Sequence, residues 1–476
     1  MNIFLVRYSE IGLKGQKTRK DMETRLVRNI KISHKMMGRE VDVKAERGRI
    51  FVYSNDRDSS IKSLSRVMGI KSFSEVNLVE SGSMDRIVDA VKTMFLDKVR
   101  GKTFAVSTRR TGNHPFTSIE LSRAVADSIY MESRGVDLSN PEIQINIEVR
   151  GNSAYVIRDR IDGPGGLPLG SEAKLTALVS GGIDSPVAVW MMLKRGSPVD
   201  MIFVSLAYPL DARQFLRNSK SLYDNWYFGY DPIIYIVDAG RLVDQYLSKG
   251  KMKYSNVSFK KIMYNIGEKL AKETGCYGII TGESSGQVSS QTPENLMQLS
   301  RMMEIPVHRP LIGLDKDEII QISRKIGTFS NDDFGEFCSL FGEVPITHIK
   351  REELQQDMDN LYDYFPSRGE IHKLRGSQID SLLNTFDQNY EKDTIEDGDT
   401  VIDLRDRLSY KQWHHPGSIN VQMDQVFEKV REMENKGNII LYCQKGLQSA
   451  HVAARLREMG YSAFYTKIDR IRNQTQ

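Results

Sequence analysis

Cysteine is scarce in this sequence, and its scarcity excludes several classes of protein. Three cysteines occur among 476 residues, too few for a disulfide framework, and no two of them have the spacing of a metal-binding pair. Paired Cys-x-x-Cys motifs are absent. In the reducing compartment that this composition predicts, an isolated cysteine is by default a small buried hydrophobic residue.

Long apolar runs are also missing. No stretch approaches the roughly 18 consecutive apolar residues that span a bilayer. Residues 1–10 read as a strand. They lack the basic segment, the apolar segment and the cleavage site of a signal peptide. The sequence therefore predicts a cytoplasmic protein with no membrane partner, and its 40% hydrophobic content is enough for several packed cores.

Net charge is low, at +4, but the charges are unevenly distributed. Residues 1–50 contain thirteen Lys and Arg against six Asp and Glu, whereas residues 351–400 contain five against thirteen. A basic amino-terminal part suits contact with a phosphate backbone, because neutralised phosphates release counterions. The same charge is typical of a solvated surface, so charge alone does not decide between the two.

The richest chemistry lies in the stretch from Leu178 to Pro186, which reads Leu-Val-Ser-Gly-Gly-Ile-Asp-Ser-Pro. Residues 175–179 predict a buried strand and residues 187–193 a helix, so the glycines fall at a strand-to-helix turn. Such a turn directs backbone N–H groups and the positive end of the helix at one spot. A phosphate is the usual occupant of that spot.

The side chains of this turn indicate one kind of ATP chemistry. Gly181 and Gly182 allow an anion to approach closely, while Ser180 offers a hydroxyl donor. Ser185 offers a second hydroxyl, and Asp184 is suited to hold Mg²⁺ against the phosphates. The loop lacks the lysine of γ-phosphate-transferring ATPases. It resembles the pyrophosphate loop of enzymes that split ATP between the α and β phosphates; an ordinary glycine-rich turn is the alternative.

Two smaller segments precede this loop. Residues 1–58 have the β-α-β-β order of a small α+β domain of ferredoxin-like type, and a basic loop with Lys14 follows their first strand. Residues 59–164 alternate helices and strands.

The second segment carries a recognisable stretch, Arg-Arg-Thr-Gly-Asn-His-Pro-Phe at residues 109–116. It resembles the THUMP domain, an RNA-binding module of RNA-modifying enzymes, and the resemblance implies binding to the acceptor end of tRNA. Arg109 and Arg110 suit phosphate contacts. Phe116 suits stacking on an unpaired base, with a place in the core as the alternative.

A turn-rich hinge at residues 162–170 leads into a central domain, residues 165–345. Apolar strands alternate there with helices, which predicts a doubly wound parallel sheet that binds its ligand at the carboxyl ends of the strands. The loop from Thr281 to Gln291 follows the fourth strand directly. Its polar, glycine-bearing composition favours a nucleotide or an RNA base over a plain surface loop.

The carboxyl-terminal part, residues 395–476, places Cys443 between an apolar strand and a helix. Backbone N–H groups and the helix dipole stabilise a thiolate at such a place, and Lys445 adds positive charge. Together with the stretches 403–405 and 415–420, this loop resembles a rhodanese domain, whose cysteine carries sulfur as a persulfide. A structural cysteine is the alternative.

Together these segments resemble the tRNA 4-thiouridine synthetase family, also called tRNA uracil 4-sulfurtransferase, over nearly the whole chain. The resemblance implies an enzyme that uses ATP and Mg²⁺ to adenylate O4 of uridine 8 in tRNA and then replaces that oxygen with sulfur. The positions that match the family's further nucleotide contacts are Leu178, Val179, Phe203, Val204, Lys260, Gly282 and Gln291. Lys260 stands where the family often has arginine, and Phe203 replaces a histidine that is frequent at the adenine pocket.

The resemblance also assigns roles to two cysteines. Cys443 would carry the persulfide, and Cys338 would resolve it by forming a Cys338–Cys443 disulfide that a thiol reductant reopens. The residues alone leave Cys338 undecided, because the acids around it disfavour a thiolate. Gln448 stands where many rhodaneses carry arginine, which favours a protein persulfide donor such as a cysteine desulfurase over thiosulfate. The acidic residues 346–394 are expected to form a linker that includes a flexible tether.

Other functions stay open. A different pyrophosphate-loop RNA-modifying enzyme would be favoured by a glutaminase domain or paired Cys-x-x-Cys motifs, and the sequence has neither. A non-catalytic tRNA-binding protein fits poorly with the intact loop at residues 180–185. Sulfur donation to thiamine thiazole synthesis through Cys443 is compatible with the main function. That role and a homodimer rest on the resemblance alone.

Overall fold

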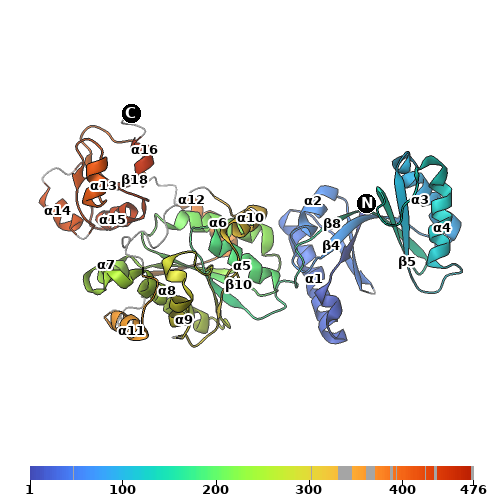
Figure 1. Ribbon diagram of the computed structural model, residues 1–476, viewed down its shortest axis with the longest axis horizontal. Helices are drawn as coiled ribbons and strands as arrows, with labels where there is room; N and C mark the ends of the chain where they lie inside the picture. The colour runs from blue at the N-terminus through green and yellow to red at the C-terminus, as the bar shows by residue number, and fades with distance from the viewer. Residues whose placement is uncertain are drawn as a thin grey trace. The chain divides into compact units, whose positions relative to one another are not determined.

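The structure is a computed structural model that describes residues 1–46, 48–301, 303–330, 346–360, 370–385, 390–392, 394–423, 425–433 and 437–472. It forms two compact units, Met1–Ser171 and Glu172–Gln476, called unit 1 and unit 2 below (Figure 1). Across the described ranges, no helix has both the length and the apolar character that crossing a bilayer requires.

Unit 1 is built on one eight-stranded sheet in the order β2-β3-β1-β4-β8-β7-β5-β6. Its main elements in chain order are β1 (Asn2–Arg7), α1 (Gln16–Met36), β2 (Asp42–Glu46), β3 (Arg49–Ser54), α2 (Arg57–Leu64), β4 (Ser72–Val79), α3 (Met84–Val99), β5 (Thr103–Thr111), α4 (Ser118–Ile129), β6 (Gly135–Val136), β7 (Ile143–Arg150) and β8 (Ser153–Asp162). The first four elements follow the predicted β-α-β-β order, and α1 buries Met22, Leu26 and Ile30 at helical spacing.

The two small segments expected from the sequence share this sheet. Strand β4 pairs with β1 on one side and with β8 on the other, so the ferredoxin-like part continues into the THUMP part without a break in the hydrogen-bonded ladder. Helices α3 and α4 pack side by side over β5 and β7 and bury one core with them (Figure 1). Strand partners depend on long-range contacts, so the sequence pattern gave no sign of this continuity.

Unit 2 begins with a central domain built on a six-stranded sheet in the order β13-β12-β9-β10-β11-β14. Its main elements are β9 (Leu175–Leu178), α5 (Asp184–Lys194), β10 (Val199–Ser205), α6 (Ala212–Trp226), β11 (Ile233–Asp238), α7 (Gly240–Lys249), α8 (Ser255–Glu273), β12 (Ile279–Ile280), α9 (Pro293–Arg301), β13 (Val307–His308), α10 (Lys316–Ile326), α11 (Arg351–Asp359), β14 (Ile371–Arg375) and α12 (Ile379–Thr385). Strands β9 to β13 are parallel, which confirms the predicted doubly wound sheet.

The strand order of this sheet reverses at β9, which lies between β10 and β12. In a doubly wound sheet such a reversal opens a crevice at the carboxyl ends of the strands, and ligands bind there. The glycine-rich turn follows β9, and the polar loop 281–291 follows β12. The topology therefore brings these two loops together.

The acidic segment 346–394 differs from the expected linker in its described part. Helix α11 packs against α8, and β14 adds to the sheet as an antiparallel edge strand beside β11. Its pairing spans Ile371 to Arg375, five residues whose alternating exposure suits an edge. This stretch therefore belongs to the central sheet and not to a tether.

The chain ends in a rhodanese-like domain with a parallel four-stranded sheet in the order β16-β15-β17-β18. Its elements are β15 (Thr400–Asp403), α13 (Arg407–Gln412), β16 (Ile419–Asn420), α14 (Val426–Glu432), β17 (Ile439–Cys443), α15 (Leu447–Glu458), β18 (Ala463–Lys467) and α16 (Ile468–Arg472). Cys443 is the last residue of β17, and α15 starts four residues later. The predicted strand-loop-helix setting of this cysteine is confirmed.

Candidate functional site

The glycine-rich turn after β9 is held in shape by its two serines. The backbone N–H of Ser180 donates to Oγ of Ser185 at 2.8 Å, and the backbone N–H of Gly182 donates to Oγ of Ser180 at 3.3 Å. Asn218 of α6 adds support from outside, because its Nδ2 donates to the carbonyl oxygens of Gly181 at 3.2 Å and Gly182 at 3.4 Å. With these carbonyls engaged, the turn keeps the form of an anion-binding loop at the start of α5.

Gly282, directly after β12, touches the start of α5. A Cβ atom added at this position would lie 2.7 Å from both Cα and N of Ser185, closer than such atoms approach in proteins. The loop after β12 therefore rests against the glycine-rich turn only because residue 282 has no side chain.

We predict that Gly282→Ala separates these two loops. The added methyl meets backbone atoms, which cannot move aside as a flexible side chain can, so we expect AMP formation to fall by about tenfold or more. The control is Gly313→Ala, because a Cβ at Gly313 would have no atom within 4 Å. Equal rates for the two variants would contradict the argument.

Asp184, at the first position of α5, is engaged through both carboxylate oxygens. Nζ of Lys316, the first residue of α10, lies 2.7 Å from Oδ1, and Nε2 of Gln287 donates to Oδ2 at 2.8 Å. Neither Lys316 nor Gln287 was singled out in the sequence. The sequence around Lys316 predicts the start of a helix, but nothing in it indicates that Lys316 pairs with Asp184.

The donor set around Asp184 suits a Mg²⁺ ion only if phosphates supply most of its ligands. Among the described residues, no group of three or more His, Cys, Asp or Glu side chains is placed to hold a metal ion. Mg²⁺ is commonly bound by one or two carboxylates plus substrate phosphates and water, and Asp184 provides one such carboxylate.

Glu283 is the centre of a buried ionic cluster next to Gly282. Its side chain is only 6% exposed; Oε1 lies 3.2 Å from Nζ of Lys260, and Oε2 accepts from Nε of Arg309 at 2.7 Å. The hydroxyls of Tyr264 and Thr281 also donate to this carboxylate. Burial raises the pKa of Glu283, but the two cations and the hydrogen bonds outweigh it and lower the pKa to about 2. Lys260 of α8 is thereby fixed beside the loop that follows β12.

We predict that Glu283→Gln destabilises unit 2 by about 3 kcal/mol, because it leaves two largely buried cations, Lys260 at 16% and Arg309 at 14% exposure, without a countercharge. The carboxylate's ordinary pKa of 4.5 is depressed on folding, so its contribution is present above that pH and is lost as the pH falls toward 2. Urea unfolding at pH 7 and at pH 3 measures this. The control Glu304→Gln, whose side chain is 81% exposed beside Lys272, should change stability by less than about 1 kcal/mol. Equal effects would contradict the prediction.

The remaining predicted nucleotide contacts lie at the carboxyl ends of two strands and in the loop after β12. Leu178, Val179, Phe203 and Val204 lie at the carboxyl ends of the adjacent strands β9 and β10, with the N–H of Val179 bonded to the carbonyl of Ile202 at 2.8 Å. The ring of Phe203 stacks on Phe215, with 4.8 Å between ring centroids, so its side chain belongs to the core. Oε1 of Gln291 accepts from the N–H of Ser284 at 3.1 Å and so closes the loop after β12.

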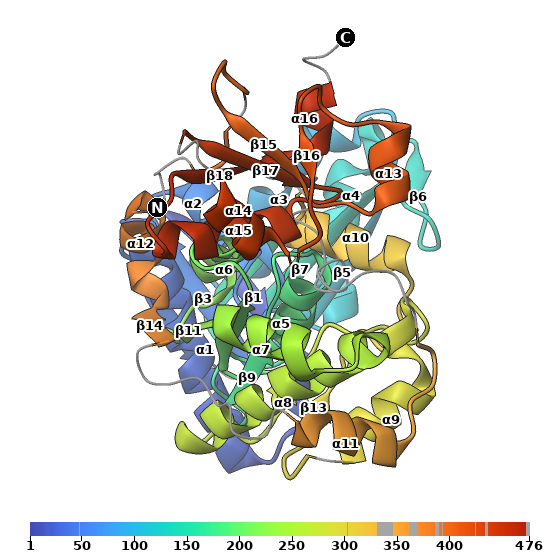
Figure 2. The same cartoon turned by 90° about the vertical axis from the view of Figure 1, so that its left-hand side faces the viewer.

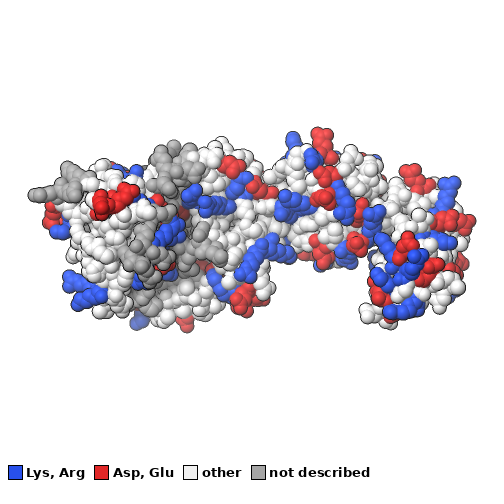
Figure 3. All heavy atoms as spheres, turned by 90° about the horizontal axis from the view of Figure 1, so that it is seen from above, with Lys and Arg blue, Asp and Glu red and all other residues white. Residues whose placement is uncertain are grey.

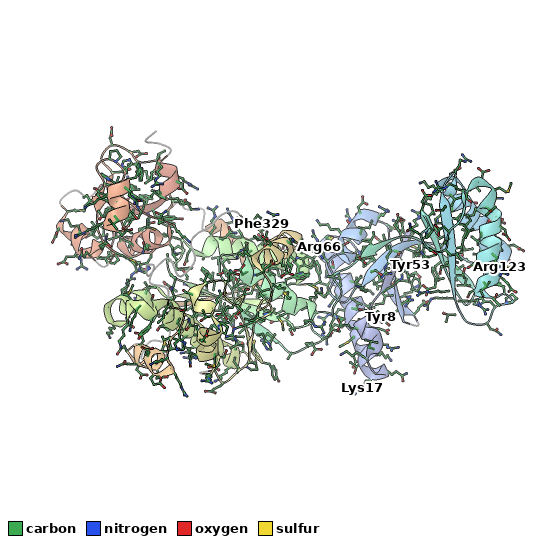
Figure 4. All side chains as sticks on the ribbon, in the orientation of Figure 1. Tyr8, Lys17, Tyr53, Arg66, Arg123 and Phe329 are labelled. Atoms are coloured by element: carbon green, nitrogen blue, oxygen red, sulfur yellow. The ribbon has the colours of Figure 1, made fainter. Side chains whose placement is uncertain are left out.

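The predicted RNA contacts in unit 1 do not all have the expected exposure. Lys14 and Arg109 are exposed, and Arg110 donates to the carbonyl of His114 at 3.1 Å. Lys17, at the start of α1, extends the basic loop that carries Lys14 (Figure 4). Phe116 is a correction: it is only 6% exposed and packs in the core beneath α3 and α4, because the buried face of this sheet needs apolar contacts.

Unit 1 also contains a cavity of about 640 Å³ that the sequence did not reveal. Five arginines line it, with Glu75, Glu142, Glu148 and Asp159 as the acidic lining residues. Arg7, Arg109, Arg158 and Arg160 come from strands β1, β5 and β8, and Arg57 comes from α2. Burial, together with the nearby Arg49, Arg160 and Arg109, outweighs the opposing effect of Glu148 and lowers the pKa of Arg7 to about 10. Basic and acidic side chains are interspersed on the face of unit 1 drawn in Figure 3, so the arginine cluster is local.

Cys443 lies in a cradle of backbone donors at the end of β17. The N–H of Gly446 donates to Sγ at 3.1 Å and the N–H of Ser449 at 3.5 Å. Gly446 has a φ of 92°, a left-handed conformation that favours glycine, and it turns the chain from β17 into α15. The thiol is buried, at 2% exposure. Cys338 lies outside the described residues, and Cys276 is a buried free thiol whose pKa is raised by burial.

Comparison with known proteins decides the family. A family described as thiamine biosynthesis protein (ThiI) matches residues 170–362, the ThiI ferredoxin-like domain matches 3–74, THUMP matches 81–159 and the rhodanese-like domain matches 387–467. A tRNA sulfurtransferase of Thermoplasma acidophilum is 42% identical over 98% of this chain and 95% of its own. The chain belongs to the tRNA sulfurtransferase family. A second family member, from Thermoplasma volcanium, is 42% identical over 100% of this chain and 98% of its own.

A solved structure of a 4-thiouridine synthetase–RNA complex with bound ATP is also similar to this chain. It is 30% identical, with a TM-score of 0.67 over 81% of this chain and 98% of its own. The fold class and the family resemblance predicted from the sequence are confirmed.

Proposed function

We propose that this chain is an ATP-dependent tRNA sulfurtransferase that converts uridine 8 of tRNA to 4-thiouridine. The observation that carries the proposal is the presence, in one chain, of an anion-binding turn at the switch point of a doubly wound sheet and of a cysteine cradled by backbone N–H groups. The first suits adenylation, and the second suits a persulfide. Membership of the tRNA sulfurtransferase family supports the pairing.

Adenylation makes O4 of uridine a leaving group. O4 attacks the α phosphate of ATP and pyrophosphate departs, so that AMP is the group later displaced from C4. In the proposed site the glycine-rich turn and the amino-terminal end of α5 hold the departing pyrophosphate, while Lys260 and Lys316 offset negative charge. Asp184 would hold Mg²⁺, which when bound supplies further charge neutralisation. Gln287 and Lys316 keep the Asp184 carboxylate in position.

Sulfur transfer then uses Cys443. Its persulfide sulfur attacks C4 and displaces AMP, which leaves a C4–S–S–Cys443 bond. The Cys338 thiolate attacks Sγ of Cys443, so that 4-thiouridine departs with the electron pair and a Cys338–Cys443 disulfide remains for a thiol reductant. Alternatively, Cys338 attacks Sγ of the Cys443 persulfide first and forms the disulfide, and the sulfide released in that step attacks C4 and displaces AMP. The Gly446 and Ser449 N–H groups stabilise the Cys443 thiolate, which takes the outer sulfur of the donor persulfide during loading while the donor thiolate departs.

For the RNA we propose unit 1. The cavity lined by Arg7, Arg109, Arg158 and Arg160 offers closely spaced cations to phosphates of the acceptor end. Lys14 and Arg110 lie on the same unit, and we keep them in the proposed RNA contact set.

We further propose a protein persulfide donor such as a cysteine desulfurase, in line with Gln448 at a position where arginine would suit thiosulfate. The description of the matched family also favours a second role, sulfur donation to thiamine thiazole synthesis from the same Cys443. A homodimer stays a prediction from the resemblance alone.

The deciding experiment is nucleoside mass spectrometry of unmodified tRNA incubated with the protein, ATP, Mg²⁺ and a persulfide source. We expect 4-thiouridine at position 8, with one AMP formed for each uridine converted. A uridine-8→cytidine tRNA is the control and should yield none. Wild-type protein that binds tRNA and hydrolyses ATP but makes no 4-thiouridine would overturn the proposal.

A further inference from the structure

The rhodanese-like domain contacts the central domain through one face of α15. Leu447, His451 and Arg455 stand one helical turn apart, which places them on the same side of the helix. Figures 1 and 2 both draw α15 on the side of its domain that lies toward α6 and α7. We call these three residues the docking face.

Each residue of the docking face has a defined partner in the central domain. Nδ1 of His451 lies 2.5 Å from the carbonyl oxygen of Leu206, and its Nε2 lies 3.2 Å from Oδ1 of Asp244 on α7. Arg455 reaches the other oxygen of Asp244, with Nε at 3.0 Å and Nη2 at 2.8 Å. Leu447 is buried in the apolar core of the central domain. The contact therefore combines an apolar anchor with a polar pair.

The receiving loop, residues 206–211, connects β10 to α6 and packs against the rhodanese-like domain. Ala207 and Leu210 belong to the same apolar cluster as Cys443. Asp211 fixes the loop by accepting from the N–H of Leu206 at 2.7 Å and of Ala207 at 3.1 Å. The loop continues into α6, whose Asn218 supports the glycine-rich turn. The docked cysteine loop is thus linked to the nucleotide site through one short, well-bonded segment.

The sulfur is buried in the docked arrangement, where Ala207 and Leu210 of the receiving loop share its apolar cluster. Cys443 is 2% exposed, yet loading from a protein donor requires an S–S bond of about 2 Å between that donor's sulfur and Sγ. A folded donor cannot approach a thiol at this exposure. The ion pair that holds the contact is partly exposed, with Asp244 at 32% and Arg455 at 26%, which suits a contact that forms and breaks.

We propose that the docking face holds the rhodanese-like domain in a protected position on the central domain, and that Cys443 exchanges sulfur with its donor and with the adenylated base only after this contact opens. The proposal rests on the proposed function, since it assigns the docked position to the resting carrier and the open position to sulfur transfer. The occupant of the receiving loop is the chain's own α15.

The test breaks the ion pair and then restores it with the charges exchanged. In Arg455→Asp, we expect iodoacetamide to alkylate Cys443 about fivefold faster than in wild type. Mass spectrometry of the peptide that contains Cys443 measures the rate. The double variant Asp244→Arg, Arg455→Asp should return to within about twofold of wild type. Arg431→Glu, a charge reversal at an exposed position on α14, is the matched control and should leave the rate unchanged.

A second measurement asks whether opening of the contact limits loading. With a protein persulfide as the donor, loading of Cys443 should be about fivefold faster in Arg455→Asp than in wild type and should return to the wild-type rate in the double variant, while AMP formation is unchanged. Alkylation of Arg455→Asp at the wild-type rate would overturn the docking contact. Faster alkylation with unchanged loading would overturn its role in restricting access to Cys443. If wild-type protein makes no 4-thiouridine, the proposed function fails, but alkylation still decides the contact.

Discussion

Cys443→Ala should lose at least about 100-fold in 4-thiouridine formation when a protein persulfide is the limiting sulfur source. The variant has no sulfur atom to carry, and the N–H groups of Gly446 and Ser449 then have no anion to stabilise. AMP formation should be retained, because the glycine-rich turn and the loop after β12 contain no part of β17. Product is measured by nucleoside mass spectrometry, and AMP by chromatography of the same reaction.

The matched control for that variant is Cys276→Ala. Cys276 is also a buried free thiol, and its sulfur lies 3.4 Å from Oγ1 of Thr274, in the core of the central domain. We expect a modest loss of stability and unchanged sulfur transfer per folded molecule. If product persists in Cys443→Ala under limiting persulfide, the rhodanese step is removed from the mechanism and free sulfide becomes the donor.

Asp184→Ala should reduce adenylation about 100-fold or more while leaving tRNA binding unchanged. The change removes the carboxylate that positions Lys316 and Gln287 and that we propose to hold Mg²⁺, so the arrangement of these three side chains is lost. Pyrophosphate exchange into ATP measures the step. Binding of tRNA, which we assign to unit 1, serves as the test that the protein is intact.

Asp224→Ala is the control for this variant. Asp224 also pairs with a lysine, Lys220 of the same helix α6, but its side chain is 42% exposed. We assign Asp224 no part in adenylation. Its loss should change pyrophosphate exchange by less than about twofold. Near-normal exchange in Asp184→Ala would remove the carboxylate from the adenylation step and leave Lys316 as the principal charged group there.

The sequence was a good guide where chemistry depends on neighbours along the chain. The turn at residues 180–185 and the loop at 443–449 each combine a strand, a glycine and a helix start within about ten residues, so both were predicted with their surroundings. The exposure of Phe116 could not be predicted from its neighbours in the sequence. A strand-adjacent aromatic ring fits either an RNA base or a core, and the packing of α3 and α4 over the sheet decides for the core.

Partners of buried charges were the main omission. Glu283, Lys316, Arg309 and Asn218 carry no local pattern that distinguishes them from surface residues, because each is paired across a large separation in sequence. Lys316 and Asp184 are 132 residues apart, and Arg309 and Glu283 are 26 apart. The docking face of α15 was missed for the same reason, since the partners of His451 and Arg455 are Leu206 and Asp244, more than 200 residues away in the sequence.

By itself the sequence determined the element types, the order of the parts, the two chemical loops and the family. These follow from hydrophobic periodicity and turn composition, which act over a few residues. Only the tertiary structure decided that β9 lies between β10 and β12, that one sheet joins the two small segments, and that Asp184, Gln287 and Lys316 meet. Strand pairing and the desolvation of charges depend on groups distant in the chain, so their outcome becomes visible only when the chain is folded.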